Sequence, residues 1–214
     1  MLVRFLTATT LLLALALVVP AEPGAAAPAT PASGTQRFVI VPGESQVSYR
    51  VGEVFINQGN RFNVALGTTN AIRGEILIDR GTPRNSRLGP ITVDISRFQS
   101  DSVRRDNAIR DRWLESSRFP TAEFTPTSIE GLPEAYTDGR ELNLHVTGNL
   151  KIREVTRPTK FAVTLWLQGT ALTGVGNTTI RMTDFGFDPP SIFGILRAED
   201  EAKLEFRFVA RPAQ

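Results

Sequence analysis

The sequence predicts an all-β fold, an antiparallel sandwich or barrel of eight or more strands. Apolar and polar residues alternate over several segments, which is the period of a strand with one face in water. Turn-forming residues such as Asp138-Gly139 and Gly169 separate these segments. The longest alternation covers the eleven residues 142–152. Strands of that length expose long edges unless the sheet closes, so we favour a barrel.

The alternating segments can be followed along the chain. They are expected at 47–51, 76–78, 91–95, 142–152, 161–167 and 204–208. Further turn signals lie at Pro42-Gly43, Gly67, Gly81-Thr82-Pro83 and Gly89-Pro90.

Residues 100–114 lack this alternation and predict the one helical segment. Ser100 or Asp101 is a candidate N-cap. Asp106 stands four residues before Arg110, the favourable order for an ion pair on a helix. We expect one helix, or two short helical turns, that covers one end of the barrel.

The first 29 residues are predicted to be a signal peptide. A basic start precedes an apolar run at 6–19, which is short for a membrane span, and small residues that suit cleavage follow. An N-terminal membrane anchor is the alternative. Residues 30–36 continue an Ala- and Pro-rich linker. The folded part, 37–214, has the length of one domain, and we expect it in the periplasm or outside the cell.

The composition excludes several chemistries. The absence of Cys excludes disulfides, thiolate nucleophiles and Cys-based metal sites, and one His cannot form a two-His metal site. The net charge is +2 with both signs interspersed, so nucleic-acid binding lacks its main driving force. The 13 Phe supply apolar area without a polar group, which suits a core or an apolar pocket.

Few residues suggest catalysis. His145 falls on the polar face of its strand, and we interpret it as a surface residue. Two groups of carboxylates are candidates for a hydrolase: Glu199, Asp200 and Glu201 in a turn before the last strand, and Asp101, Asp106 and Asp111 in the helical segment. We interpret both groups as solvated or salt-bridged. An extracellular carboxylate-dependent hydrolase remains an alternative.

The run Ile192-Phe193-Gly194-Ile195-Leu196 is unusually apolar for a loop. Two interpretations stay open: a plug at one end of the barrel, or a lid or mouth against which an apolar ligand packs.

Several motifs, in their order and spacing, resemble the YceI-like polyisoprenoid-binding family over about residues 37–210. They are Gly74-Glu75-Ile76-Leu77-Ile78-Asp79, Arg105-Asp106, Ile109-Arg110, Trp113-Leu114, Arg118-Phe119-Pro120, the run from Gly148 to Pro158 (GNLKIREVTRP), Asp184-Phe185-Gly186 and Pro189-Pro190-Ser191-Ile192. The chain departs from the family at 49–53, which lacks a His often found there, and at 57–69, which is rich in Asn and Gly.

The resemblance implies a long lipocalin-like barrel of about eight strands with the helical segment at 100–114. It implies an exported, non-enzymatic protein that sequesters or carries an isoprenoid lipid, such as an isoprenoid quinone, or a similar amphiphile, without a cofactor. Burial of such a chain gains about 0.8 kcal/mol per methylene. Transient membrane contact and a homodimer are compatible with this function. A structural barrel with a filled core is a further alternative.

Strand parity then selects the residues expected to bind the ligand. They are Phe124, Leu144, Val146, Leu150, Phe161, Val163, Leu165, Phe206 and Phe208, with Phe193 and Ile195 at the mouth.

Overall fold

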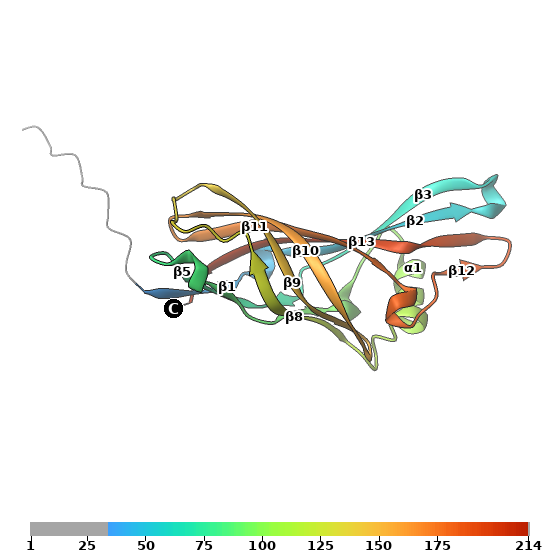
Figure 1. Ribbon diagram of the computed structural model, residues 1–214. Helices are drawn as coiled ribbons and strands as arrows, with labels where there is room; N and C mark the ends of the chain where they lie inside the picture. The colour runs from blue at the N-terminus through green and yellow to red at the C-terminus, as the bar shows by residue number, and fades with distance from the viewer. Residues whose placement is uncertain (1–33, 214) are drawn as a thin grey trace, which may run out of the picture. The chain divides into compact units, whose positions relative to one another are not determined.

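The computed structural model describes residues 34–213 and confirms the all-β class (Figure 1). Its strands form a 13-stranded sheet in which every pairing is antiparallel. The strands are β1 (Thr35–Ile40), β2 (Gln46–Phe55), β3 (Arg61–Thr69), β4 (Ile72–Arg73), β5 (Glu75–Asp79), β6 (Arg87–Leu88), β7 (Ile91–Asp94), β8 (Thr121–Glu130), β9 (Glu141–Ile152), β10 (Val155–Gln168), β11 (Ala171–Arg181), β12 (Ser191–Ile192) and β13 (Leu196–Pro212). The helical elements are α1 (Val103–Ala108), a π-helical turn η5 (Ile109–Trp113) and the 3-10 turns η1 (Pro42–Glu44), η2 (Ile56–Gln58), η3 (Pro83–Asn85), η4 (Ile95–Arg97) and η6 (Thr183–Phe185).

The predicted signal peptide lies outside the described residues. The first strand already includes Thr35 and Gln36, which we had assigned to the linker. Among the described residues, no helix has the length and apolar character needed to cross a bilayer.

The strand count exceeds the predicted number because several long chain paths are interrupted. β1 and β2 together make one path, because both pair with β13. β3, β4 and β5 make the next path, in which β3 pairs with β2, β4 with β7 and β5 with β1. Pro42 separates β1 from β2, and Pro90 separates β6 from β7, because proline has no N–H to donate to the ladder. Apart from the short β12, the strands follow about eight paths, and the pairing of β4 with β7 closes the ring.

The predicted helix is present but is capped differently. The hydroxyl of Ser102, rather than that of Ser100, accepts the first bond, from the backbone N–H of Arg105 at 3.3 Å. Ser100 donates to the carboxylate of Asp106 at 2.6 Å. The predicted pair of Asp106 with Arg110 is wrong, because Arg110 donates instead to a backbone carbonyl and to an Asn side chain.

Gly67 was predicted to mark a turn and instead lies within β3. A Cβ at this position would stand 2.2 Å from Cε1 of Tyr49, so the ring of Tyr49 needs the space that glycine leaves. Glycine at position 67 therefore allows the ring of Tyr49 to lie directly against the backbone of β3.

At one end of the barrel, which we call the closed end, inward-facing side chains form a buried layer that is also part of the cavity wall. Ile40, Ala210, Leu172 and Leu167 follow one another across β1, β13, β11 and β10, and each is at most 3 % exposed. Phe38, which is fully buried, extends this layer along β1. These residues are therefore as shielded from bulk water as a protein core, although Ile40, Leu172 and Leu167 also line the cavity.

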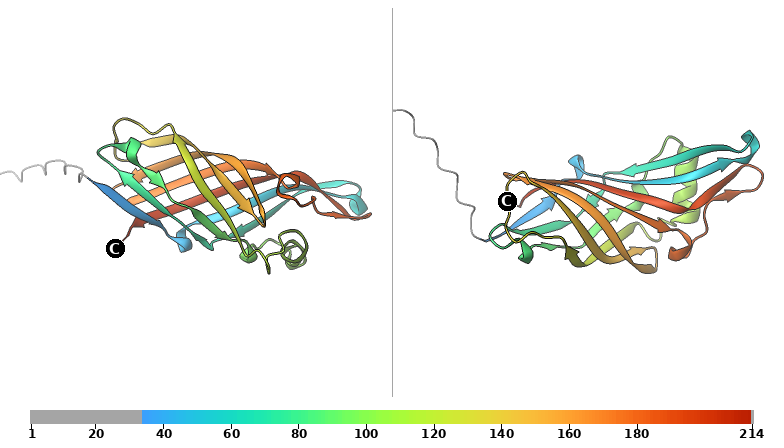
Figure 2. Two further views of the ribbon diagram at one scale, coloured as in Figure 1. Left: turned by 60° about the horizontal axis from the view of Figure 1, so that its bottom comes forward. Right: turned by 45° about the horizontal axis from the view of Figure 1, so that its top comes forward.

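The opposite end, which we call the helix end, carries α1, η5 and two projecting turns. The β2–β3 hairpin and the β12–β13 turn reach beyond the rest of the sheet (Figures 1 and 2). They lie side by side, because the backbone N–H of Ile56 donates to the carbonyl of Ile195 at 2.8 Å. We refer to them together as the paired tips, residues 54–66 and 190–198.

Candidate functional site

The barrel encloses a cavity of about 750 Å³. Side chains from all parts of the sheet line it, from Ile78 and Leu88 near the closed end to Phe55 and Ile195 at the helix end. Its volume lies in the upper part of the range of roughly 300–1,000 Å³ that is usual for small-molecule sites. The cavity contradicts the alternative of a barrel with a filled core.

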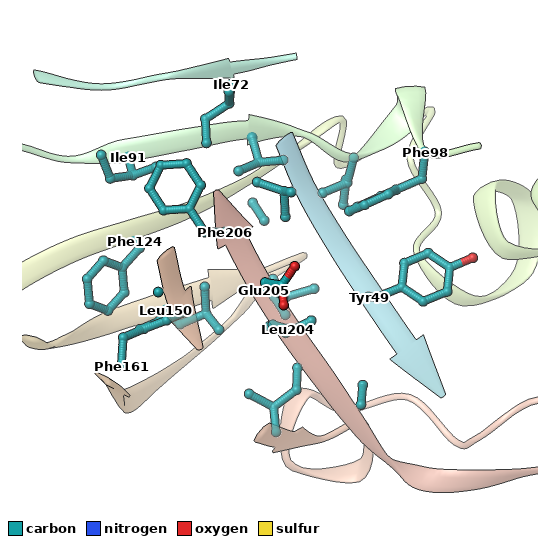
Figure 3. Close-up of a pocket in the computed structure, with 18 of the residues that line it drawn as sticks. Tyr49, Ile72, Ile91, Phe98, Phe124, Leu150, Phe161, Leu204, Glu205 and Phe206 are labelled. Atoms are coloured by element: carbon teal, nitrogen blue, oxygen red, sulfur yellow. The ribbon is translucent and has the colours of Figure 1, made fainter. Parts of the chain in front are cut away.

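Aromatic rings form much of the wall (Figure 3). Phe124 and Phe161 pack edge to face with their centroids 4.9 Å apart. Phe206 stacks on the neighbouring phenylalanine of β13 at 5.0 Å. Towards the helix end, Tyr49 and Phe98 pack edge to face at 5.2 Å. The wall is therefore apolar and shaped by rigid rings, which suits an apolar ligand.

The structure brings ten of the eleven predicted site residues together on this wall. They are Phe124, Leu144, Val146, Leu150, Phe161, Val163, Leu165, Ile195, Phe206 and Phe208. Several point into the barrel yet remain half-buried, among them Phe161, Val163 and Phe206, because part of their surface faces the cavity. Their contact with a ligand stays a prediction.

Phe193 is the exception. It stands at the β12–β13 turn, fully exposed, and is not part of the cavity wall. Gly194 next to it has a φ of +69°, which allows the tight turn that carries Phe193 outwards. The interpretation of this loop as a plug is therefore wrong for Phe193, whereas Ile192 and Ile195 do face the cavity.

Sequence reasoning missed several wall residues. Tyr49 has the same parity as its neighbours in an alternating segment and could have been selected by that signal. Ile91 has the parity of the predicted segment 91–95 and could have been selected in the same way, whereas Ile72 lies in a two-residue strand, too short for alternation to show. Phe98 and Trp113 come from irregular and helical segments, so strand parity could not identify them.

A buried ion pair anchors the helix to the barrel. Glu53 on β2 accepts hydrogen bonds from the guanidinium of Arg105 and from the side-chain amide of Asn63, both at 2.8 Å. The side chain of Glu53 is only 5 % exposed, and Arg105 also pairs with the more exposed Asp101. This cluster holds α1 against the cavity at the helix end.

The same cluster sets the electrostatics of the cavity wall. Burial, together with the nearby carboxylate of Asp106, raises the pKa of Tyr49 to about 12. Burial by itself would lower the pKa of Arg105, but the carboxylates of Glu53 and Asp101 outweigh it and the net shift is upward. Tyr49 thus contributes a neutral hydroxyl to the cavity wall, close to the ion pair of Glu53 with Arg105, which also lines the cavity.

The cavity reaches the surface mainly at the helix end. Four residues of the helical segment line the cavity and are also exposed: Arg104, Asn107, Asp111 and Arg112. Ile195 on the paired tips is another. Towards the closed end the exposed wall residue is Arg87. We conclude that the helix end provides the principal access.

The carboxylates considered for a hydrolase do not gather in the cavity. Glu199, Asp200 and Glu201 lie within β13, at a bulge, rather than in a turn before it, and none of them lines the cavity. Asp200 instead accepts hydrogen bonds from the backbone and hydroxyl of Thr183, at 3.0 and 2.6 Å. His145 is exposed on β9, as predicted.

Metal-ligating side chains are also dispersed. Within residues 34–213, His, Cys, Asp and Glu do not form a group of three or more that could hold a metal ion.

Comparisons with solved structures agree with this architecture. A polyisoprenoid binding domain from Saccharophagus degradans, described as implicated in plant cell wall breakdown, superposes with a TM-score of 0.61 at 10 % identity, covering 84 % of this chain and all of that one. BcnA from Burkholderia cenocepacia superposes with a TM-score of 0.59 at 20 % identity, covering 79 % and 98 % of the two chains. At these identities the likeness shows the fold.

Sequence comparison identifies the family. Protein YceI of Salmonella newport is 26 % identical over 133 residues, which is 60 % of this chain. The chain spans about 65 % of the length of that curated relative. The YceI-like domain matches residues 38–210, nearly the whole described part of the chain. The chain therefore belongs to the YceI-like domain family.

Proposed function

We propose that this protein is an exported carrier or sequestering protein for a long apolar lipid, a polyisoprenoid or an amphiphile of similar shape, and that it has no catalytic activity. The observation that carries the proposal is the cavity of about 750 Å³ with its wall of aliphatic and phenylalanine side chains. Such a wall binds by burying apolar surface, which needs no reactive group. The solved S. degradans relative, named a polyisoprenoid binding domain, supports the ligand class.

Export to the periplasm or beyond is part of this proposal. Its support is the sequence of the first 29 residues, with a basic start, an apolar run and small residues that suit cleavage. The absence of Cys is compatible with an oxidising compartment but does not require one.

The orientation of the ligand follows from the distribution of polar groups. The apolar tail would occupy the barrel between Phe124, Phe161 and Phe206. The polar head would lie at the helix end, where Tyr49 offers a hydroxyl and Arg104 reaches solvent. A tail needs no polar partner, whereas a buried head group without one would be costly.

The direct test is organic extraction of the purified protein from a host that makes prenyl lipids, followed by mass spectrometry. We expect about one isoprenoid or similar lipid per chain. Val163→Phe places a larger side chain in the cavity and should reduce recovery several-fold. Ala162→Phe is the matched control, because Ala162 precedes Val163 on β10 and is exposed.

A second readout uses the two tryptophans. Trp113 lines the cavity and Trp166 does not. In the Trp166→Phe variant, a polyprenol added to delipidated protein should change the fluorescence of Trp113 until the cavity is full. An empty extract together with no fluorescence change would contradict the proposal.

A further inference from the structure

The exposed apolar side chains of the barrel are concentrated at the helix end. Within residues 34–213, seven of the eight large apolar side chains that stay exposed belong to the paired tips or to α1: Ile56, Phe62, Val64, Leu66, Val103, Phe193 and Ile195. The eighth, Val39, lies on β1 towards the closed end. An apolar cluster of this kind marks a surface that meets a partner.

The paired tips turn these side chains outwards by strand parity and tight turns. Along β3, Phe62 and Val64 alternate with Asn63, which donates to Glu53, and with Ala65, which lines the cavity. Phe193 stands at the β12–β13 turn and is fully exposed. Phe62 and Phe193 therefore project from two turns that lie side by side.

The charge of the paired tips has one sign. Residues 54–66 and 190–198 contain Arg61 and Arg197 but neither Asp nor Glu. Apolar side chains that insert at an interface, flanked by basic residues, are the features by which a protein adsorbs to a membrane with anionic lipids.

The paired tips are also continuous with the cavity. Phe55 and Ile192 line the cavity, while their chain neighbours Ile56 and Phe193 are exposed. Ile195 both lines the cavity and is exposed, so an apolar side chain connects the interior of the barrel with its outermost turns. A lipid that moved along it would keep its chain away from water, which the hydrophobic effect favours.

We propose that the paired tips dock on the surface of an anionic membrane, so that the helix end faces the lipid from which the cavity is loaded or into which it is emptied. This inference rests on the proposed lipid binding for its purpose, but the docking can be measured without any ligand in the cavity. A second copy of this chain, paired through β3, is the competing occupant of the same surface.

The test is co-sedimentation with vesicles of phosphatidylcholine alone and with vesicles that also contain phosphatidylglycerol. The protein should lack residues 1–29, because the apolar run at 6–19 would itself bind lipid. All the strand pairings fall between Thr35 and Pro212, so the barrel is complete without that segment. We expect stronger binding to the anionic vesicles, weakened by added salt.

The decisive variant is Phe62→Ser with Phe193→Ser. Loss of two inserted rings should reduce binding to anionic vesicles by about tenfold or more. Val39→Ser is the matched control, an exposed apolar residue away from the paired tips, and should bind as the unchanged protein does. Arg61→Glu with Arg197→Glu should remove the preference for anionic vesicles. Circular dichroism establishes that each variant is folded.

The outcomes separate docking from lipid binding. If the unchanged protein ignores the vesicles but yields a bound lipid on extraction, the docking proposal is wrong and the proposed function stands. If it binds vesicles through Phe62 and Phe193 but contains no lipid, docking stands and the proposed function is wrong. A dimer that Phe62→Ser dissociates, without vesicle binding, would assign the surface to a second copy and overturn docking.

Discussion

The two ends of the barrel use apolar residues in opposite ways. At the closed end, Leu167 and Leu172 are almost completely buried and belong to a continuous packed layer. At the helix end, Phe62 and Phe193 are exposed, and inward residues such as Leu204 face the cavity. Leu167 and Leu172 also line the cavity, so the ends differ in how far their apolar side chains are buried, and we expect the more buried end to contribute more to stability.

The polar groups at the two ends also differ in the element that they hold in place. At the closed end, the hydroxyl of Tyr136 donates to the carbonyl of Leu167 and lies 2.9 Å from Asp138, while the guanidinium of Arg80 covers its ring at 5.7 Å. These contacts fasten the β8–β9 loop over the packed layer. At the helix end, the pair of Glu53 with Arg105 fastens a short helix beside the access to the cavity.

The largest expected difference concerns the same substitution at each end. Leu172→Ala should lower the free energy of unfolding by about 2–5 kcal/mol, because its side chain is almost completely buried. Leu204→Ala should cost less than about 1.5 kcal/mol, because that side chain is only partly buried. Urea unfolding of both variants measures the difference. Equal losses would mean that the two ends are packed alike.

A second prediction concerns the anchor of the helix. Glu53→Gln leaves the guanidinium of Arg105 without its buried carboxylate and should cost about 2 kcal/mol, since hydrogen bonds between charged groups contribute roughly 1.5–3 kcal/mol. Hydrogen exchange should accelerate in α1 before it does in β11. Glu44→Gln is the control, because its pair with Arg211 is exposed and should contribute much less than the buried pair. Similar losses in both variants would contradict the anchoring role.

Strand parity predicted most of the cavity wall because a period of two is a local property of the chain. β9 was expected at 142–152 and runs from Glu141 to Ile152, so Leu144 and Val146 fall on the inner face, as predicted. The parity of one strand does not reveal whether its inner face meets other side chains or a cavity. Leu165 and Leu167 share the inner face of the same strand and both line the cavity, yet Leu167 is buried at the closed end and Leu165 is half-buried.

The features that sequence did not predict depend on residues far apart in the chain. Glu53 and Arg105 are 52 residues apart and meet only because the helix folds back under β2. Gly67 resembles a turn residue in sequence, and its contact with Tyr49 exists only across paired strands. Phe193 was placed at the mouth by its apolar neighbours, but the turn at Gly194 directs it outwards.

A third prediction uses the only two tyrosines of the sequence, which stand at opposite ends. The pKa of Tyr49 and that of Tyr136 are both raised to about 12, in each case chiefly by burial. Folding therefore favours the neutral phenols. This stabilisation is complete below the unfolded value of about 10 and is lost as the pH rises towards 12. Ultraviolet titration should show little tyrosinate in the native protein at about pH 10.

The variants Tyr136→Phe and Tyr49→Phe isolate each phenol. A lipid in the cavity should raise the pKa of Tyr49 further, because it removes water from that wall. Tyr136 also lines the cavity, but its hydroxyl is already bonded to the carbonyl of Leu167, so its pKa should change less. An equal response at both ends would show that the ligand does not distinguish them. Titration of Tyr49 near pH 10 in the native protein would contradict its burial.

The smallest expected effect concerns acid at the helix end. Asp200 accepts two hydrogen bonds from Thr183 at the start of η6, and these bonds hold the pKa of its carboxyl below the usual value. A lowered pKa means that the carboxylate stabilises the fold above about pH 4, and that this contribution is lost as the pH falls through the lowered value. Because the group is largely solvated, Asp200→Asn should cost only a few tenths of a kcal/mol at pH 7. The difference in stability between the variant and the unchanged protein should shrink at acid pH, where the side chain at position 200 is neutral in both.

Hydrogen exchange localises the effect. Acid should loosen residues 182–186 before residues 167–172, because the first segment depends on a titrating carboxylate and the second on buried apolar side chains. If acid loosened the closed end first, the closed end would be the less stable of the two, which would contradict the conclusion drawn from its burial.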